Sequence, residues 1–264
     1  STASAIPTTP SRTADLVALA KPRLNMLVVV SAVAGYVMAS GDTRDVWRLL
    51  YMVVGTALVA GGASAFNQII ERKPDALMQR TRLRPMPDGR VPTRDAWVYG
   101  SVLTIAGLAI LAFGANVLSA IVALLTVASY AVVYTPLKRY SSFSTVIGAI
   151  PGALPPVIGW AAALDELSQG AWVLFGIVFL WQLPHFLAIA WMYREDYARA
   201  GIRMLPVVEP DGASTARQIL IASAILIPVS LLPAYLSMAG LWYSIGAVMM
   251  GLFFLHAGYR VARE

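Results

Sequence analysis

The sequence lacks cysteine and has few charged residues. Without cysteine the chain can form no disulfide and can use no thiolate in catalysis or metal binding. Only 13% of its 264 residues are Asp, Glu, Lys or Arg, whereas a soluble domain carries about a quarter. Acidic and basic residues are absent from long stretches, namely 24–41, 49–70, 96–137, 140–164, 167–193 and 218–259. Together these absences exclude an ordinary soluble domain.

The apolar stretches predict a membrane protein. A spanning helix needs roughly 20 mostly apolar residues, and each of the two 42-residue stretches holds two such helices around turns at 114–116 and 237–240. Eight passes are predicted, at 24–40, 49–68, 96–114, 117–135, 144–164, 171–192, 218–237 and 241–259. Lipid forbids open sheet, so we predict an all-α, polytopic helical bundle that forms one domain over residues 1–264. The polar residues 1–13 are predicted to be disordered.

The basic residues predict the orientation of this bundle. Eighteen of the 20 Lys and Arg residues fall in the N-terminal segment, the even-numbered connections and the C-terminal segment, and only Arg44 and Arg48 fall in the others. Because cytoplasmic loops are enriched in Lys and Arg, the basic face is predicted to be cytoplasmic. The net charge of +6 therefore reflects topology and a lipid bilayer partner, and it requires no nucleic acid.

A first polar cluster follows the second predicted pass, in the segment 67–85. Asn67, Glu71 and Asp75 recur every four residues, and three arginines follow at 80, 82 and 84. Oxygen ligands of this kind suit Mg²⁺, which is usually held by one or two carboxylates together with substrate phosphates. Pro74 disfavours a helical Lys73, so Asp75 lies either on a continued helix or on a loop that swings toward the same point.

A second cluster, Arg194 to Arg199, ends the sixth predicted pass on the same membrane side. It contains Glu195 and Asp196, and further cations of that face are Lys21, Arg23, Lys138 and Arg139. The carboxylates would hold metal and the cations would bind phosphate oxygens. The two clusters indicate ionisation of an allylic diphosphate beside an apolar cavity. Two solvated connecting loops are the simpler alternative.

Two predicted passes contain helix-breaking or polar residues. Pro151, Pro155 and Pro156 interrupt the fifth pass, which is either a kinked packing helix or a cavity wall. Gln182 and His185 lie deep in the sixth pass, three residues apart and therefore on one helical face. They form either an interhelical hydrogen bond or part of a pocket, and the neighbouring prolines favour the pocket.

The polar cluster NQIIERKPDALMQRTRLRPMPDGRV resembles the first aspartate-rich region of the UbiA-type intramembrane prenyltransferases. Its nearest likeness is to the branch that acts on heme, and the similarity continues through AKPRLNMLVVVSA, YTPLKRYSSFSTVIGAIPGALPPVIGW and WQLPHFLAIAWMYREDYARAGIRMLPVV. The resemblance implies a nine-helix bundle with a magnesium–diphosphate site near the cytoplasmic ends of helices two and six. It also implies transfer of farnesyl from farnesyl diphosphate to the 2-vinyl group of heme B, followed by water addition to give heme O.

The resemblance also assigns roles to residues of this chain. Metal and diphosphate would be held by Asn67, Glu71, Asp75 and, from the second cluster, Asp196. Phosphate oxygens would be bound by Arg72, Arg80, Arg84, Arg194 and Tyr197, together with Lys21, Arg23, Lys138 and Arg139. His185 and its neighbour Gln182 would face the heme.

The chain departs from the family at several points. The family usually has Asp at the position of Glu71 and no proline at the position of Pro74, so the ligand geometry differs. Eight passes are found where nine are expected, and a ninth would follow Glu264 or have been removed. The second cluster lacks the repeated aspartates of the quinone branch, which agrees with the heme branch.

Three rival functions stay open at this stage. They are prenylation of an aromatic quinone precursor by the same fold, a small transporter, and a structural membrane subunit. The absence of an Arg- and Ser-rich presequence favours a bacterial inner membrane over a mitochondrial one. A heme A synthase or an oxidase assembly is the partner that the family leads us to expect.

Overall fold

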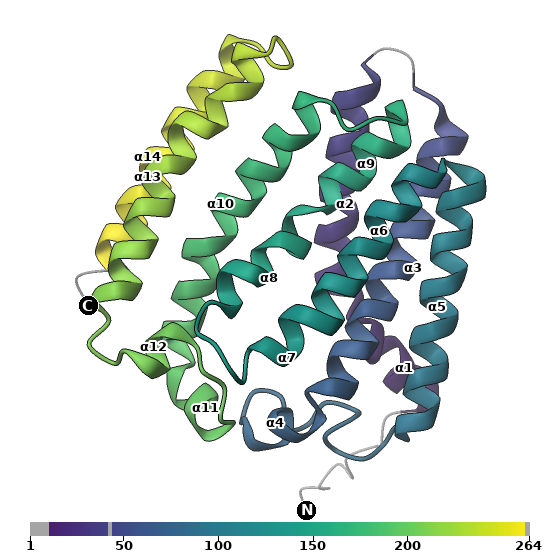
Figure 1. Ribbon diagram of the computed structural model, residues 1–264, viewed down its shortest axis with the longest axis vertical. Helices are drawn as coiled ribbons and strands as arrows, with labels where there is room; N and C mark the ends of the chain where they lie inside the picture. Colours follow the sequence, from purple (N-terminus) through teal and green to yellow (C-terminus); the bar gives the residue numbers. More distant parts are fainter. Residues whose placement is uncertain (1–10, 42–43, 262–264) are drawn as a thin grey trace, which may run out of the picture.

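The computed structural model describes residues 11–41 and 44–261, which are mostly helical and contain no β-strand (Figure 1). Eight helical segments are long and apolar enough to cross a membrane, namely Arg12–Ser40, Val46–Ile70, Thr93–Gly114, Val117–Leu137, Ser144–Leu164, Gln169–Met192, Ala213–Tyr235 and Leu241–Val261. The eight predicted passes and both predicted turns are thereby confirmed. The ninth helix of the resemblance has no counterpart within the described residues.

The elements have the following bounds in chain order: α1 (Arg12–Ala20), α2 (Pro22–Ser40), α3 (Val46–Ile70), α4 (Arg72–Leu77), α5 (Thr93–Gly114), α6 (Val117–Ala128), η1 (Ser129–Tyr134), α7 (Thr135–Leu137), α8 (Ser144–Ala153), α9 (Pro155–Leu164), α10 (Gln169–Met192), α11 (Arg194–Arg199), α12 (Leu205–Val208), α13 (Ala213–Tyr235) and α14 (Leu241–Val261). Element η1 is a wide π-helical turn that continues α6 into α7.

The predicted disordered segment 1–13 is only partly within the described residues. Residues 1–10 lie outside them, whereas Arg12 and Thr13 are helical, contrary to the prediction. The Ser11 hydroxyl accepts a hydrogen bond from the backbone N–H of Ala14 and so caps α1. Such capping satisfies one of the N–H groups that have no partner within the helix.

Small residues allow the central helices to approach closely. At the crossing of α2 and α9, a Cβ added to Gly35 would lie 2.0 Å from the carbonyl oxygen of Pro156, and one added to Gly159 would lie 1.8 Å from that of Ala32. Close backbone contact at small residues is a major source of helix association in membranes, where lipid is as apolar as the side chains. These contacts hold the middle of α2 against α9.

The fifth pass is divided into two helices, as its prolines predict. Helix α8 ends at Ala153, Leu154 separates the two helices, and α9 begins with Pro155. A proline in the first turn of a helix loses no intrahelical hydrogen bond. Residues 155–162 are all buried, so this segment is packed inside the bundle.

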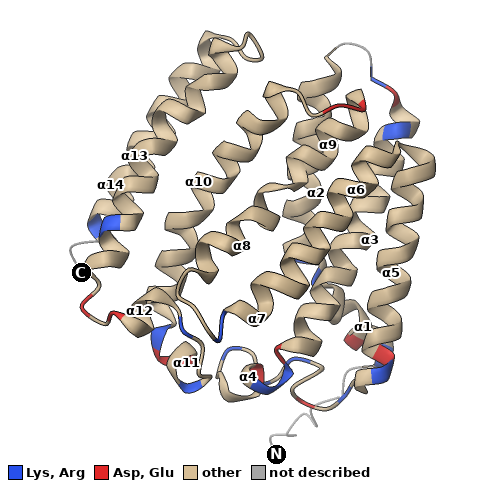
Figure 2. Ribbon diagram, in the orientation of Figure 1, with Lys and Arg blue, Asp and Glu red and all other residues tan. Residues whose placement is uncertain are grey.

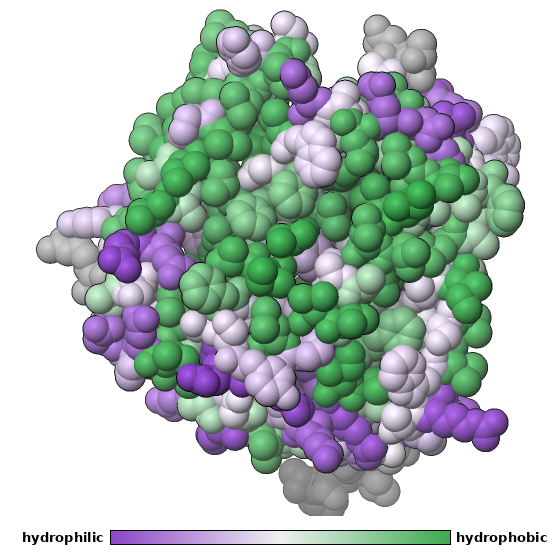
Figure 3. Space-filling model, viewed as in Figure 1, coloured by the Kyte–Doolittle hydropathy of each residue, from purple (hydrophilic) through white to green (hydrophobic). Residues whose placement is uncertain are grey.

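The described charges gather at one end of the bundle. Figure 2 shows most Lys, Arg, Asp and Glu at the end that carries α4, α7 and α11, and few at the opposite end. Between the two ends the visible surface is mostly hydrophobic (Figure 3). Both polar clusters therefore lie at one mouth of an apolar bundle, and the chain is an integral membrane protein.

Replacing Gly159 with Ala should destabilise the bundle. Its new methyl group would meet backbone, which cannot rotate away, so we expect a loss of about 1–3 kcal/mol, the usual range for overpacking. Thermal unfolding in detergent measures this loss. Gly246→Ala is the matched control, since nothing lies within 4 Å of a Cβ there. Equal melting temperatures for the two variants would contradict the proposed role of the α2–α9 contact.

Candidate active site

A buried polar network joins four of the predicted site residues. The Lys21 ammonium donates to Asn67 Oδ1 over 3.0 Å, and Asn67 Nδ2 donates to Glu71 Oε2 over 2.8 Å. The Lys138 ammonium donates to Glu71 Oε1 over 2.8 Å. Asn67 and Glu71 come from the end of α3, Lys21 from the junction of α1 and α2, and Lys138 from the end of α7. Three separate parts of the sequence thus meet around one carboxylate.

Asp75 continues the line of Asn67 and Glu71. The backbone N–H of Glu71 donates to Asn67 O, and that of Asp75 donates to Glu71 O over 2.8 Å. Asp75 therefore lies on a helix, α4, and the loop placement is wrong. Pro74 is the third residue of this short helix, where its missing N–H costs little because the first N–H groups of a helix have no partner within it.

The Asp75 carboxylate is 1% exposed and accepts a hydrogen bond from Arg84 over 2.8 Å. Lys21 lies within electrostatic range of Glu71, Asp75, Arg84 and Lys138. The first cluster is therefore one group of two carboxylates and three cations.

The charges of Glu71 and Lys138 stabilise each other. Burial opposes the charge on Glu71, but the ammonium of Lys138 and the hydrogen bonds from Lys138 and Asn67 outweigh it, so the pKa of Glu71 lies below its ordinary value. Burial likewise opposes the charge on Lys138, yet the Glu71 carboxylate raises the pKa of Lys138 well above its ordinary value. Both groups are therefore ionised at neutral pH.

The second cluster lies next to the first. Asp196, on α11, forms an ion pair with Arg199 and accepts a hydrogen bond from the backbone N–H of Arg80 over 3.4 Å. The Arg80 guanidinium donates to the Tyr197 hydroxyl over 3.2 Å. The following residue, Thr81, donates its hydroxyl to the backbone oxygen of Asp75 over 2.8 Å. Residues 80 and 81 thus connect the two acidic clusters.

A polar cleft of about 590 Å³ opens beside the second cluster. Its lining consists of Gln79, Arg80, Met192, Tyr193, Arg194, Glu195, Asp196 and Arg199. Arg80 lies over the Tyr193 ring at 4.7 Å from its centroid, a cation–π arrangement that orients the guanidinium. Arg194 lies over the Trp191 ring and donates to the Trp191 backbone oxygen over 3.2 Å. Arg194 therefore reaches this cleft and makes no described contact with the first cluster.

Three predicted phosphate-binding residues lie away from both clusters. Arg72 donates to the Thr93 hydroxyl over 3.1 Å, at the start of α5. Arg23 and Arg139 are exposed, and no described contact joins either of them to Glu71, Asp75 or Asp196. Arg72 was predicted from its place in the first cluster, and Arg23 and Arg139 from their position on the same membrane side; neither criterion fixes the direction in which a side chain points.

Sequence reasoning missed Thr135 and Tyr134. The Thr135 hydroxyl accepts a hydrogen bond from Asn67 Nδ2 over 3.3 Å and donates to Tyr130 O over 2.8 Å. The Lys138 ammonium lies 4.5 Å from the centroid of the Tyr134 ring. Both residues belong to a stretch without acidic or basic residues, which gave no local signal; the wide turn η1 brings them to the cluster.

Gln182 and His185 do not form a common site. Gln182 is buried, and its Nε2 donates to Val178 O over 3.0 Å and to Ala149 O, on α8, over 3.5 Å. Gln182 therefore makes the interhelical hydrogen bond that was the alternative, and its role at the heme stays a prediction. His185 is exposed and stacks on Trp181 with ring centroids 5.0 Å apart.

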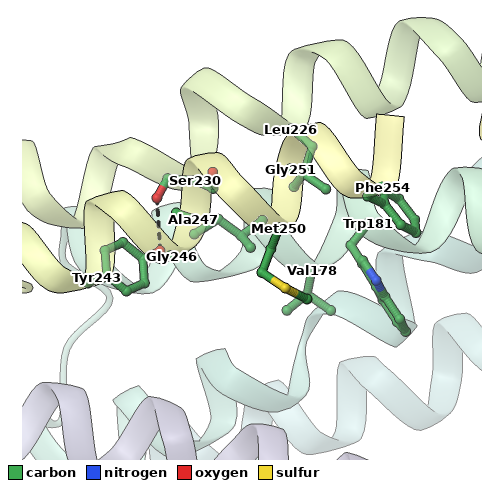
Figure 4. A pocket seen from close by; sticks show the side chains of 11 residues that line it. Val178, Trp181, Leu226, Ser230, Tyr243, Gly246, Ala247, Met250, Gly251 and Phe254 are labelled. Atoms are coloured by element: carbon green, nitrogen blue, oxygen red, sulfur yellow. Dashed lines mark hydrogen bonds between the residues drawn. The ribbon is translucent and has the colours of Figure 1, made fainter. Parts of the chain in front are cut away.

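Trp181 also borders an apolar cavity of about 490 Å³ between α10, α13 and α14 (Figure 4). Val178 lies beside it on α10, and Met250 and Phe254 point into the cavity from α14. The Tyr243 hydroxyl closes one end by donating to the backbone oxygen of Ser230 over 2.8 Å. The cavity could receive an apolar ligand, and His185 stands one helical turn from its Trp181 wall.

The oxygen groups of the first cluster suit Mg²⁺. Within the described residues, no three Asp, Glu, His or Cys side chains gather closely enough to hold a metal by themselves. Magnesium needs fewer, because it is usually bound by one or two carboxylates plus substrate phosphates. Glu71 and Asp75, one helical turn apart and both ionisable, supply that number, and each is now balanced by a cation.

Comparison with known proteins shows which family and which named proteins the chain resembles. Residues 28–264 match the UbiA prenyltransferase family. The protoheme IX farnesyltransferase of Solibacter usitatus (strain Ellin6076) is 51% identical over 259 residues, which covers 95% of this chain and 89% of that protein. The protoheme IX farnesyltransferase of Salinibacter ruber (strain DSM 13855 / M31) is 47% identical, over 91% of this chain and 85% of that protein.

Solved structures share the fold. A structure of digeranylgeranylglyceryl phosphate synthase superposes with a TM-score of 0.78 at 18% identity, over 94% of this chain and 90% of that one. The structure of a UbiA homologue from Archaeoglobus fulgidus bound to GPP and Mg²⁺ superposes with a TM-score of 0.72 at 16% identity, over 92% of this chain and 86% of that one. The chain belongs to the UbiA prenyltransferase family, among relatives named protoheme IX farnesyltransferase.

Proposed function

We propose that the chain transfers a farnesyl group from farnesyl diphosphate to the 2-vinyl group of heme B and so forms heme O. The observation that carries this proposal is the group of two buried carboxylates and three cations at one mouth of an apolar bundle. The names of relatives at 51% and 47% identity support heme as the acceptor. Neither aromatic prenylation nor transport has comparable support.

The diphosphate would bind between the two clusters. Glu71 and Asp75, with the Asn67 carboxamide, would hold Mg²⁺, and Asp196 would contribute from the other side of the cleft. When bound, Mg²⁺ would neutralise the developing charge of the pyrophosphate leaving group. The UbiA homologue with GPP and Mg²⁺ lends support through its shared fold.

The cations of the site would exchange partners when the substrate binds. Lys138, Arg84 and Lys21 now contact Glu71, Asp75 and Asn67, and in the complex they would donate to phosphate oxygens instead. Charge-assisted hydrogen bonds of this kind are the strong ones. Arg80 would bind from the second cluster, where Tyr193 and Tyr197 orient its guanidinium.

The carbon–carbon bond would form in the apolar part of the bundle. The C–O bond of farnesyl diphosphate breaks, and the allylic carbon then bonds to the terminal carbon of the vinyl group. Water adds to the resulting cation and loses a proton, which leaves a hydroxyethylfarnesyl side chain. Exclusion of bulk water protects the allylic cation from premature hydrolysis. His185, stacked on Trp181 beside the apolar cavity, would contact the heme.

The bundle would lie in a bacterial inner membrane with both clusters toward the cytoplasm. The concentration of Lys and Arg at the end that carries α4 and α11 supports this orientation (Figure 2), and the named relatives are bacterial. A heme A synthase or an oxidase assembly would consume the product.

Product analysis tests the acceptor. The purified chain incubated with hemin, farnesyl diphosphate and Mg²⁺ should yield a heavier and more hydrophobic heme on reversed-phase chromatography with mass detection, because the product gains a C15 chain. Chelation of Mg²⁺ with EDTA should abolish the product. Product with 4-hydroxybenzoate and none with hemin would sink the proposal and favour the aromatic prenyltransferase.

Asp75→Asn should lower turnover by at least about 100-fold, a loss typical of removing a group that stabilises transition-state charge. The substitution keeps the shape of the side chain and removes its negative charge, so the metal would lose a charged ligand. Asp165→Asn is the matched control, since Asp165 lies at the end of α9 with φ 56°, where Asn is well tolerated. Near-normal turnover of a folded Asp75→Asn protein would refute the metal role.

His185→Ala should raise the KM for hemin by at least about tenfold, the equivalent of one lost contact worth 1.4 kcal/mol. The KM for farnesyl diphosphate should stay unchanged, because His185 makes no described contact with either acidic cluster. Steady-state kinetics with each substrate varied in turn measures both values. His256→Ala, an exposed histidine on α14, is the control; equal damage to both KM values would remove His185 from the heme site.

A further inference from the structure

The junction of α1 and α2 holds Lys21 in an uncommon backbone conformation. Lys21 has φ 46° and ψ 58°, the left-handed region that residues other than Gly seldom adopt. Pro22 follows, which disfavours a right-handed helical Lys21 and so ends α1 there. Something in the surrounding structure must hold the chain in this turn, because strained residues persist only where their neighbours fix them.

The last carbonyl groups of α1 have no partners within the helix, and buried side chains supply them. Gln68, which is 1% exposed, donates its Nε2 to Leu19 O over 2.9 Å and to Ala18 O over 3.5 Å. Asn25 donates its Nδ2 to Ala20 O. The Gln68 side-chain oxygen is buried and makes no hydrogen bond to any described residue, so among these residues Gln68 uses only the donor end of its amide.

Gln68 and its neighbour Asn67 hold opposite parts of the same short segment. Gln68 binds the backbone just before Lys21, whereas Asn67 accepts the Lys21 ammonium over 3.0 Å. The first half of α1 is fixed independently, because the buried Asp15 pairs with Arg90 over 3.0 Å. Two consecutive residues of α3 thus position Lys21. Gln68 binds the backbone just before it, and Asn67 binds its side chain.

We propose that Gln68 is a positioning residue that holds the Lys21 ammonium in the diphosphate site. This proposal rests on the proposed function. Gln68 touches neither Glu71 nor Asp75 in the described contacts, so it acts through Lys21. Without its amide, Leu19 O would be buried and unsatisfied, the end of α1 would shift, and Lys21 would leave the left-handed turn.

A double-mutant cycle tests this proposal. Gln68→Met keeps the length of the side chain and removes the donor, and Lys21→Met removes the ammonium. Each variant should weaken farnesyl diphosphate binding by about 10- to 100-fold, the value of one charge-assisted hydrogen bond. The double variant should be no weaker than Lys21→Met alone, because two residues that act through one contact are not additive. Isothermal titration with farnesyl diphosphate and Mg²⁺ gives the affinities.

The controls separate positioning from folding. Gln218→Met, at an exposed position on α13, should bind like the unmodified chain. If Gln68→Met does not fold, Gln68→Asn replaces it, since the shorter amide keeps a donor but falls short of Leu19 O and should show the same loss. The positioning role alone would be overturned if the two losses of farnesyl diphosphate affinity multiplied in the double variant. It would also be overturned if Gln68→Met lowered the melting temperature but bound farnesyl diphosphate normally. No binding by the unmodified chain would overturn the proposed function as well.

Discussion

The site depends on the pairing of charges that lie at the edge of an apolar bundle. A charge taken out of water is costly, and removal of one partner from a buried pair costs about 3–5 kcal/mol because the other is left uncompensated. Glu71 and Asp75 are almost fully buried and are each balanced by one cation, Lys138 or Arg84. These pairs hold the two carboxylates in place before any substrate binds. A magnesium-bound diphosphate would carry both positive and negative charge. Its metal could pair with the carboxylates while its phosphate oxygens pair with Lys138 and Arg84.

The same charges that predict the orientation of the bundle also form its candidate site. The helices supply an apolar surface with few acidic or basic residues. Contact with lipid would require only that the basic loops lie at one end, and it would not require these loops to be ordered. The loop after α4 is ordered instead, because residues 80 and 81 bind Asp196 and the Asp75 backbone and Arg90 binds Asp15. A loop tied at three points to α1, α4 and α11 can present its arginines at fixed positions.

The sequence alone predicted the membrane passes and the site residues that recur with the helical period. The runs without acidic or basic residues gave all eight helices, and the four-residue spacing of Asn67, Glu71 and Asp75 gave the acidic line of the first cluster. Pro74 left a helix and a loop both open for Asp75, and the structure shows a helix because a break at Glu71 makes the proline one of the first residues of α4. Arg72 and Arg139 make no described contact with the acidic residues, because a position near the clusters in the sequence or on the same membrane side does not fix where a side chain points.

Contacts between distant segments could not be read from spacing. Gln182 bonds to Ala149 on α8, a partner that depends on how two helices cross. Thr135 and Gln68 have no charge and lie in apolar or helical stretches, so only the packing of α6–η1 and α1 against α3 reveals them. Both are polar groups that satisfy backbone oxygen atoms, at Tyr130 and Leu19.

The wide turn η1 shows why such contacts matter for the site. Its end is closed by Thr135, whose backbone N–H and hydroxyl both donate to Tyr130 O, five residues earlier. The same hydroxyl accepts from Asn67, so the distortion of this helix is tied to the acidic helix α3. Lys138 follows within one turn and reaches Glu71. π-Helical turns are often found at functional sites, and here the turn brings a cation to the buried Glu71 carboxylate, whose other oxygen already accepts from the uncharged Asn67 amide.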